Sequence, residues 1–188
     1  MKKLVLIAHM SLDGFVAGER GEFDGFNPSP ENLEFVCSLT DEADTILVGR
    51  VSYQMLETAW PNAWNKPNAT ASEVKYSNWY NASEKIVLSN TLSKGNSENT
   101  KIVNGDIAGE IKKIKEQGNK NILLFGGPTT FRKLNALNLV DEYWIILYPT
   151  LFGKGIPLFT PGEPMKNLKL MNSIKLKNGE MPINYKVQ

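Results

Sequence analysis

Residues 121–131 of the chain, NILLFGGPTTF, pass from an apolar strand through two glycines into the start of a helix. The run at 122–125 has strand length, and Pro128 suits the first turn of a helix. Gly126 and Gly127, at the carboxyl end of a buried strand, let a ligand lie against bare backbone where the helix points its free amides. The alternative is a tight turn closed by a helix cap. The stretch therefore predicts an α/β unit with a candidate ligand site.

Similar units lie on both sides of this stretch. Further apolar runs of strand length occur at residues 4–8, 45–48, 86–88 and 143–147. Apolar residues at helical spacing predict helices at 29–39, 106–117 and 128–137, the second with Asp106 as its N-cap. The expected buried stripes are Leu33, Val36 and Leu39, then Ile107, Ile111 and Ile114, then Phe131, Leu134 and Leu137. Near-continuous apolar strands alternating with helices predict an α/β fold, a mainly parallel sheet with helices on both faces.

Two segments depart from this alternation. Residues 168–176 and 183–187 flank the turn 177–179, which predicts a C-terminal antiparallel hairpin and a mixed sheet. Residues 57–81 are polar, show no clean period and hold three of the four tryptophans, Trp60, Trp64 and Trp79. We interpret this stretch as a lid whose aromatic side chains wall a substrate pocket; the alternative is a long loop pinned down by its tryptophans.

The composition indicates a cytoplasmic protein that acts on a small molecule. A length of 188 residues suits one domain, 1–188. With 21 basic and 20 acidic residues the net charge is +1, which favours neither nucleic acid nor a membrane surface as partner. The apolar start is too short for a membrane span and lacks a cleavage site, and the one cysteine, Cys37, forms no internal disulfide. No cluster has metal-ligand spacing, so no metal site is predicted.

Two more strand ends carry polar turns. In TILVGRVSYQML a strand stops at Gly49, Arg50 adds a forked cation, and Ser52 opens a helix. In EKIVLSNTL a strand ends in Ser89 and Asn90. Each turn alone is also an ordinary structural corner. Together with the Gly-Gly turn, they are what an open α/β sheet needs to hold an extended cofactor along its carboxyl edge.

Five segments carry a resemblance to a known family: MSLDGFVAG, VGRVSY, VLSNTL, LLFGGPTTFRKL and NLVDEYWIILYPTLFGKGIPLF. They resemble the dihydrofolate reductase superfamily, and more closely the branch with the reductase domain of the bifunctional riboflavin-biosynthesis deaminase/reductase. The resemblance implies a dihydrofolate reductase-like three-layer sandwich, NADPH as cofactor, a cis Gly126–Gly127 peptide and a homodimer. The implied cofactor residues are Gly49, Arg50, Ser52, Ser89 and Asn90 on the adenosine-phosphate side, Gly126, Gly127 and Thr129 around the pyrophosphate, and Ala8, Ala17 and Gly18 at the nicotinamide.

Two residues near the expected nicotinamide are candidates for catalysis. Asp13 lies in the SLDG loop that this branch carries over its active site, and the alternative is a turn-forming Asp-Gly pair. His9, the lone histidine, ends the first strand and is a candidate proton donor; the alternative is a structural role. Where dihydrofolate reductases place a helix carboxylate, this chain has Leu33, and we expect Glu31 and Glu34 on the outer face.

The sequence therefore predicts an NADPH-dependent oxidoreductase that passes a hydride to a C=N or C=O bond of a small heterocyclic substrate. The resemblance implies a ribosylamino-pyrimidine of the kind used by 5-amino-6-(5-phosphoribosylamino)uracil reductase. Water or Asp13 is expected to supply the proton, with the Trp60 and Trp64 region closing over the substrate. The alternatives are a non-catalytic nucleotide-binding sensor on the same fold, and dihydrofolate reduction.

Overall fold

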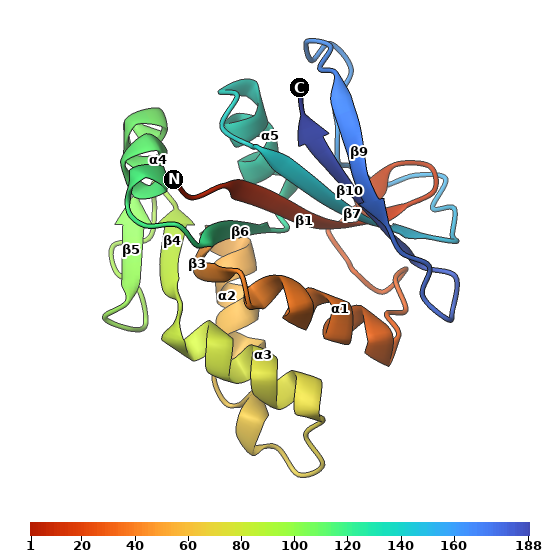
Figure 1. The fold of residues 1–188 in the computed structure, drawn as a ribbon, viewed down its shortest axis with the longest axis horizontal. Coiled ribbons are helices and arrows are strands. Elements are labelled where there is room, and N and C mark those ends of the chain that lie inside the picture. Colours follow the sequence, from red (N-terminus) through yellow and green to blue (C-terminus); the bar gives the residue numbers. More distant parts are fainter.

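The computed structural model describes residues 1–188, whose elements alternate between strands and helices over most of the chain (Figure 1). The strands are β1 (Leu4–Ser11), β2 (Phe15–Ala17), β3 (Ala43–Gly49), β4 (Glu84–Leu88), β5 (Thr100–Val103), β6 (Asn121–Phe125), β7 (Glu142–Tyr148), β8 (Ile156–Pro157), β9 (Leu168–Ser173) and β10 (Met181–Val187). The helices are α1 (Pro30–Thr40), α2 (Arg50–Ala59), the 3-10 turn η1 (Ala63–Asn65), α3 (Ala71–Ala82), α4 (Ile107–Glu116) and α5 (Pro128–Ala136).

Eight of these strands form one sheet in the order β5-β4-β3-β6-β1-β7-β10-β9, and β2 pairs with β8 separately. The six strands from β5 to β7 in this order are parallel, so their carboxyl ends share one edge. In the register of that edge Gly49 pairs with Leu88, and Ser11 with Tyr148. β10 is antiparallel to both β7 and β9, which confirms the C-terminal hairpin and the mixed sheet.

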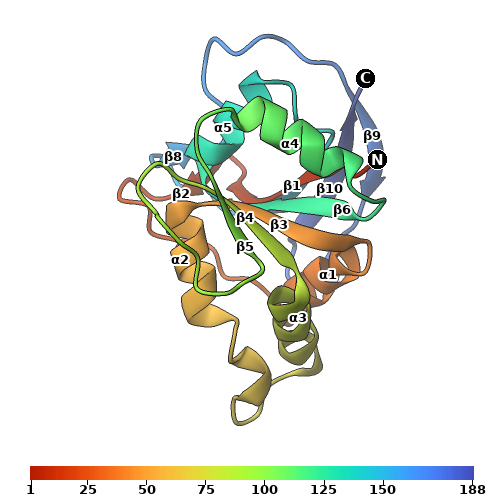
Figure 2. The same cartoon turned by 90° about the vertical axis from the view of Figure 1, so that its left-hand side faces the viewer.

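The helices cover both faces of the sheet, as the sequence predicted (Figures 1 and 2). α4 and α5 pack on one face, where Ile107, Ile111 and Ile114 are buried against the sheet. α1, α2 and α3 pack on the other face. Side chains of β1 alternate between these two layers, because successive residues of a strand point to opposite faces. None of the helices combines the length and apolar character that a membrane span requires.

Two of the expected helix stripes are only partly right. α5 ends one residue early, at Ala136, and Leu137 is 43% exposed. On α1 the most deeply buried face is made by Asn32, Phe35, Val36, Cys37 and Thr40, while Leu33 and Leu39 are half-buried beside it. The face is therefore rotated from the expected stripe and carries a polar residue, Asn32, toward the sheet.

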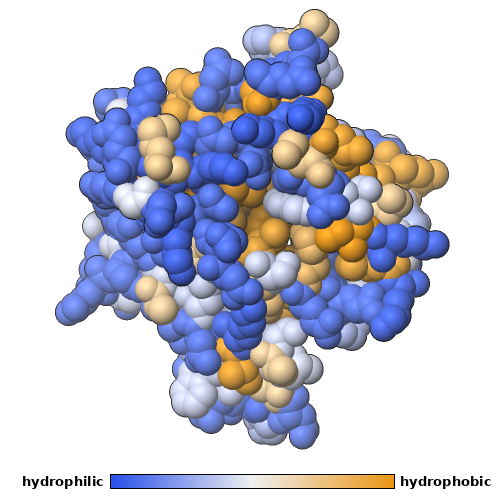
Figure 3. All heavy atoms as spheres, in the orientation of Figure 1, coloured by the Kyte–Doolittle hydropathy of each residue, from blue (hydrophilic) through white to orange (hydrophobic).

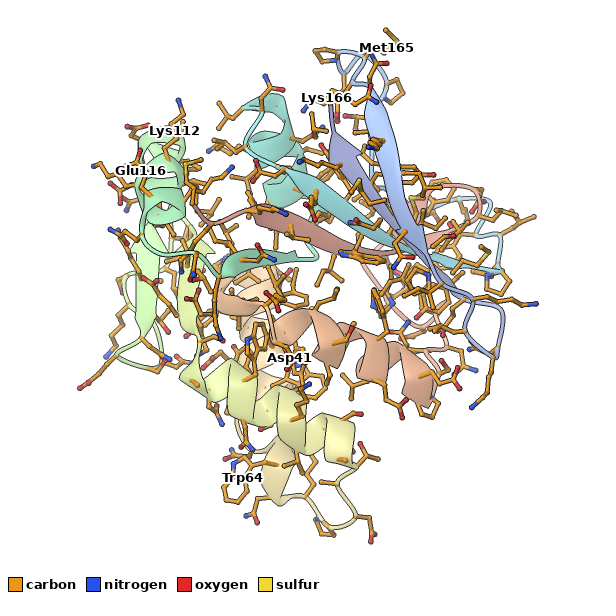
Figure 4. All side chains as sticks on the ribbon, in the orientation of Figure 1. Asp41, Trp64, Lys112, Glu116, Met165 and Lys166 are labelled. Carbon is orange, nitrogen blue, oxygen red and sulfur yellow. The ribbon has the colours of Figure 1, made fainter.

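The lid expected at 57–81 is wrong, because this segment contains α3. Thr70 caps the helix and Glu73 returns a hydrogen bond to the Thr70 amide, which is a capping box that the sequence displays as T-x-x-E. The Trp60 ring lies 4.3 Å from that of Tyr76, and Trp79 Nε1 donates to the Ala43 carbonyl at the start of β3. Trp64 lies far from the sheet (Figure 4). Trp60 and Trp79 therefore serve packing rather than a substrate pocket, whereas Trp64 is 49% exposed.

Candidate active site

The turns after β3 and β6 are in direct contact at the carboxyl edge of the sheet. A Cβ on Gly49 would overlap Thr130 Oγ1, and a Cβ on Gly127 would lie 3.2 Å from Ser52 Oγ. Each turn thus packs against the first helical turn of the other unit. The Gly-Arg turn at Gly49 and the Gly-Gly turn at Gly126 are 77 positions apart in the sequence, yet they meet at one place.

Both helices that begin at this place lack a side-chain cap. α2 starts after Gly49 and α5 after Gly127, and neither glycine has a side chain to accept from the first amides. The other three α-helices are capped by Ser29, Thr70 and Asp106, the last as predicted. Free amides and the positive ends of two helix dipoles therefore converge, which suits a phosphate or pyrophosphate.

The Gly126–Gly127 peptide is trans, since the chain has no cis peptide bond, and the expectation of a cis link is wrong. The turn is made instead by positive φ at both residues, 54° at Gly126 and 62° at Gly127. Left-handed backbone is nearly free of cost for glycine alone, so two glycines achieve the sharp turn without cis geometry.

The polar side chains around the two turns are available to a ligand. Arg50 is exposed, and the one hydrogen bond of its side chain is a long one, 3.5 Å from Nη1 to Gln54 Oε1. Thr129 is exposed and Ser52 is half-buried beside the glycines. Arg50 is therefore a free, forked cation at the start of α2, next to the converging amides.

The turn after β4 is already partly satisfied within the chain. Ser89 Oγ accepts hydrogen bonds from the amides of Thr91 at 3.2 Å and Leu92 at 3.0 Å. The Ser89 side chain thus closes its own turn, which is the ordinary structural role that the sequence also allowed. Asn90 is exposed. Because β4 is next to β3, these residues extend the same edge on the side expected for the adenosine end.

At the opposite end of this sheet edge, the residues expected near the nicotinamide lie in strands of two different sheets, or directly after one of these strands in the case of Gly18. Ala8 is 5% exposed in β1 and belongs to the core under α5. Ala17, 8% exposed, pairs with Ile156 of β8, and the Gly18 amide donates to the Glu22 carbonyl. β1 lies between β6 and β7, so the edge continues from the Gly-Gly turn to His9.

Asp13 ties two loops together. Its carboxylate accepts from Ser11 Oγ at 2.6 Å, the Gly153 amide at 2.7 Å and the Phe152 amide at 3.1 Å. The hydrogen bond from Ser11, with those from the two amides, lowers the pKa of the carboxyl below its usual range. Asp13 thus holds no proton at neutral pH, and its geometry suits the positioning of the loop that follows β7.

His9 lies in an aromatic cluster at the end of β1. Its Nδ1 is 2.8 Å from Tyr148 Oη, and its ring centroid is 5.4 Å from that of Phe23 and 6.1 Å from that of Phe26. Burial lowers the pKa of His9 to about 4. The imidazole is therefore neutral at pH 7 and acts through hydrogen bonds rather than through a positive charge.

Three buried polar residues that sequence reasoning missed lie behind His9. Asn32 Nδ2 donates to Tyr148 Oη at 3.0 Å and to Glu180 Oε1 at 3.3 Å. Glu180, which is 0% exposed, also accepts from the Ser29 hydroxyl at 2.6 Å. Asn32 could have been singled out from the sequence, because it is an asparagine on the apolar face of a helix. No local feature of the sequence indicates Tyr148 or Glu180, which come from distant segments.

The acidic residues of α1 behave as expected. Glu34 is exposed, and Glu31 forms an ion pair with Lys177 at the surface. Neither carboxylate faces His9. The carboxylate on this side of the site comes instead from Glu180, which precedes β10.

Comparison with known proteins agrees with this architecture. The sequence profile of a family described as the RibD C-terminal domain matches residues 2–181. "Uncharacterized protein YyaP" of Bacillus subtilis (strain 168) is 29% identical over 184 residues, 98% of this chain and 94% of that protein. A pyrimidine reductase-like protein from Corynebacterium diphtheriae has a TM-score of 0.73 at 16% identity, covering 100% and 92% of the chains. Dihydrofolate reductase of Enterococcus faecalis, in complex with NADP(H), has a TM-score of 0.63 at 12% identity, covering 99% and 96%. The dihydrofolate reductase-like fold predicted from the sequence is thereby confirmed.

Proposed function

Because the chain belongs to the RibD C-terminal domain family, we propose that it is an NADPH-dependent reductase of a ribosylamino-pyrimidine or a similar small heterocycle. The observation that carries this proposal is the meeting of two uncapped helix N-termini beside a free arginine. The fold neighbours support it, because one is described as pyrimidine reductase-like and another binds NADP(H).

The residues at the strand ends fit a dinucleotide. The amides of α2 and α5 would hold the pyrophosphate, with Gly126 and Gly127 leaving the space that side chains would fill. Arg50 would form a charge-assisted fork with the 2′-phosphate, which favours NADPH over NADH. Ser52, Ser89, Asn90 and Thr129 would add hydrogen bonds, and Ala8, Ala17 and Gly18 would line the nicotinamide.

Bound NADPH supplies a hydride to the acceptor carbon of a C=N or C=O bond, and the neighbouring nitrogen or oxygen takes one proton from water. The chain contributes orientation and exclusion of solvent. Phe26, 5% exposed, packs on Tyr148 and Phe152, so the segment before α1 shields this end of the site. Asp13 fixes the loop that carries Phe152.

Cofactor titration tests the proposal. We expect NADPH to quench or shift protein fluorescence at lower concentration than NADH, and Arg50→Ala to weaken NADPH binding by about tenfold or more, the value of a charged hydrogen bond. NADH binding is expected to change little in this variant. Lys112→Ala is the matched control, because it removes a surface cation on the outer side of α4 (Figure 4). This variant should bind NADPH as the wild-type chain does. Failure of both cofactors to bind would contradict the proposal.

A turnover assay separates the reductase from the non-catalytic sensor. NADPH oxidation is followed by absorbance with ribosylamino-pyrimidines and with dihydrofolate as acceptors. We expect turnover with the pyrimidines and little with dihydrofolate, because no α1 carboxylate faces the site. Cofactor binding without turnover on any acceptor would favour the sensor.

We further propose that the chain forms a homodimer through the face around β9. All six β9 residues are exposed, among them Leu168, Leu170 and Met171. Beside them lies an apolar groove of about 230 Å³ lined by Met10, Tyr143, Ile145, Leu147, Phe159, Leu168, Ile183 and Tyr185. Figure 3 shows apolar side chains gathered over this side of the molecule. An edge strand with such a surface is suited to pairing with a second copy.

Light scattering on the eluting protein measures the assembly. We expect about twice the 21.0 kDa of one chain, and Leu170→Lys is expected to shift the mass toward one chain because it places a charge in the apolar contact. The control for a charge change on the same strand is Lys169→Glu, because the side chain of Lys169 points to the opposite face of the sheet from that of Leu170. A clean monomer of the wild-type chain at micromolar concentration would overturn the dimer.

A further inference from the structure

Tyr148 is a buried tyrosine whose hydroxyl lies between two polar side chains. Its Oη is 2.8 Å from His9 Nδ1 and 3.0 Å from Asn32 Nδ2. Burial raises the pKa of Tyr148, and the nearby Glu180 charge raises it further, so the phenol keeps its proton at neutral pH. A phenol proton that is left without an acceptor in the interior is costly. The two neighbours therefore decide where this proton points.

Asn32 acts as a donor toward Tyr148, because Glu180 fixes the orientation of the Asn32 amide. Glu180 is 0% exposed, and its Oε1 accepts from the Ser29 amide at 3.2 Å and from Asn32 Nδ2 at 3.3 Å. Turning the Asn32 amide over would set its carbonyl oxygen against the carboxylate, where two acceptors would meet. Nδ2 carries two hydrogens, one for Glu180 and one for Tyr148 Oη. Tyr148 thus accepts from Asn32 and cannot donate to it.

The other neighbour of the Tyr148 hydroxyl is His9 Nδ1, so the phenol proton points to this nitrogen. Burial lowers the pKa of His9 to about 4, and the neutral imidazole carries one proton on one of its two nitrogens. Since Nδ1 accepts, the proton of the ring lies on Nε2. The opposite tautomer would direct the Nδ1–H and the phenol proton at each other.

The Nε2–H group of His9 is accessible and lies close to the Gly-Gly turn. Every fully enclosed side-chain nitrogen and oxygen of the chain has a hydrogen-bond partner, whereas the chain provides none for Nε2, so Nε2 reaches the surface. Ile7 pairs with Phe125, which brings the turn that follows Phe125 beside the end of β1. The rings of Phe23 and Phe26 flank the imidazole. A polar donor among apolar rings is typical of a small-molecule site.

We propose that His9 presents a neutral Nε2–H donor to the substrate, and that Asn32, acting through Tyr148, is the positioning residue that fixes this tautomer. The inference rests on the proposed reductase and narrows its substrate to a molecule with a free lone pair at this place, a carbonyl oxygen or an unprotonated ring nitrogen. A molecule that turns a C–H or N–H group to His9 leaves the donor unbonded and is selected against. His9 orients the substrate, and the proton of the reduction comes from water.

Nitrogen NMR reads the tautomer directly, because His9 is the only histidine of the chain. In ligand-free protein labelled with ¹⁵N at histidine, we expect a protonated-type shift at Nε2 and an unprotonated-type shift at Nδ1 at neutral pH. Tyr148→Phe removes the hydrogen bond to Nδ1 and leaves a bare lone pair against an apolar ring, so the two shifts should move further apart. A wild-type chain protonated at Nδ1, or a Tyr148→Phe spectrum identical to wild type, would overturn the inference.

Asn32→Asp tests the positioning role. The new carboxyl takes the hydrogen bond of the Tyr148 phenol, whose oxygen then accepts from His9 Nδ1–H, and we expect the two histidine shifts to exchange. If this variant does not fold, Asn32→Ala replaces it. There the phenol loses the donor that directs its proton and is free to turn away from His9, so the two shifts should move toward each other. Wild-type shifts in the variant that folds would refute the role of Asn32.

The matched control is Asn135→Asp. Asn135 is 4% exposed, donates from Nδ2 to Glu163 and accepts from Tyr143 Oη, so this change also sets a carboxyl between a glutamate and a tyrosine. Tyr143 belongs to the core on the opposite face of the sheet from Tyr148. Both histidine shifts should stay in place. An exchange of the shifts in this control would assign the effect to general loss of stability and contradict the inference.

Kinetics test the substrate part with a ribosylamino-pyrimidine as acceptor. We expect His9→Leu to lower kcat/KM by at least about tenfold, and His9→Gln, whose amide keeps an N–H group, to stay within about threefold of wild type. Asn32→Asp should lower kcat/KM while the Kd for NADPH is unchanged. Wild-type kcat/KM in His9→Leu would refute the contact with the substrate. If NADPH does not bind or no acceptor is turned over, the proposed function and the substrate part fail together, whereas the ligand-free NMR spectra still decide the tautomer.

Discussion

Replacing Gly127 with valine is expected to weaken NADPH binding by at least about 100-fold, or about 3 kcal/mol, while the chain stays folded. Gly127 has a φ of 62° and a Cβ there would lie 3.2 Å from Ser52 Oγ. A valine side chain would fill the place where we propose that the phosphate oxygens of the cofactor reach the uncapped amides of α2 and α5. The left-handed backbone adds strain of roughly 1–2 kcal/mol, which lowers stability but leaves the fold intact. Fluorescence titration with NADPH measures the loss.

Gly162→Val is the matched control for this experiment. Gly162 also has a left-handed φ, 90°, but a Cβ there meets no atom within 4 Å, and the residue lies in the loop between β8 and β9. The backbone strain is therefore comparable, while the candidate site is untouched. Wild-type affinity in Gly127→Val would show that the phosphates bind elsewhere, and equal losses in both variants would assign the effect to stability.

The two turns that form this site were predictable from the sequence because each is local. A strand that stops at glycine and a helix that starts immediately after it are visible within a dozen residues, as in 121–131 and around Gly49. Parallel pairing then brings the carboxyl ends together without further information. Helix α3, within residues 57–81, was not predicted for the opposite reason. Its apolar residues face α1, η1 and the sheet at once, so the helix shows no single apolar stripe. The one local sign of the helix in the sequence is the capping box that begins at Thr70.

The polar network behind His9 was not predictable in the same way. Asn32, Tyr148 and Glu180 lie on α1, at the end of β7 and before β10, and no short motif relates them. Glu180 follows a turn residue, Gly179, where a charged side chain normally points to water. Its burial results from the closing of the β9–β10 hairpin over the start of α1, which is a tertiary event.

Replacing Phe131 with alanine is expected to lower the free energy of unfolding by about 3–5 kcal/mol, the usual cost of a large cavity in a core. Phe131 is 0% exposed on α5, and its ring lies 5.4 Å from that of Phe159 and 6.2 Å from that of Tyr143. Urea denaturation followed by circular dichroism measures the loss. Leu137→Ala, just beyond the same helix and 43% exposed, should change stability by less than about 1 kcal/mol. A Phe131→Ala cost as small as that of Leu137→Ala would mean that the core relaxes around the gap.

The same variant connects the core to the site, because Phe131 anchors the helix whose N-terminus we assign to the pyrophosphate. The Phe131 amide donates to the Gly127 carbonyl at 3.0 Å, so displacement of the ring reaches the Gly-Gly turn within one helical turn. A ligand that binds the folded state alone at 100 times its Kd adds about 2.7 kcal/mol of stability. We therefore expect NADPH to restore much of the loss in Phe131→Ala and none in a Phe131→Ala/Gly127→Val double variant, measured as the shift of the urea midpoint. Equal restoration in both would place the cofactor away from the start of α5.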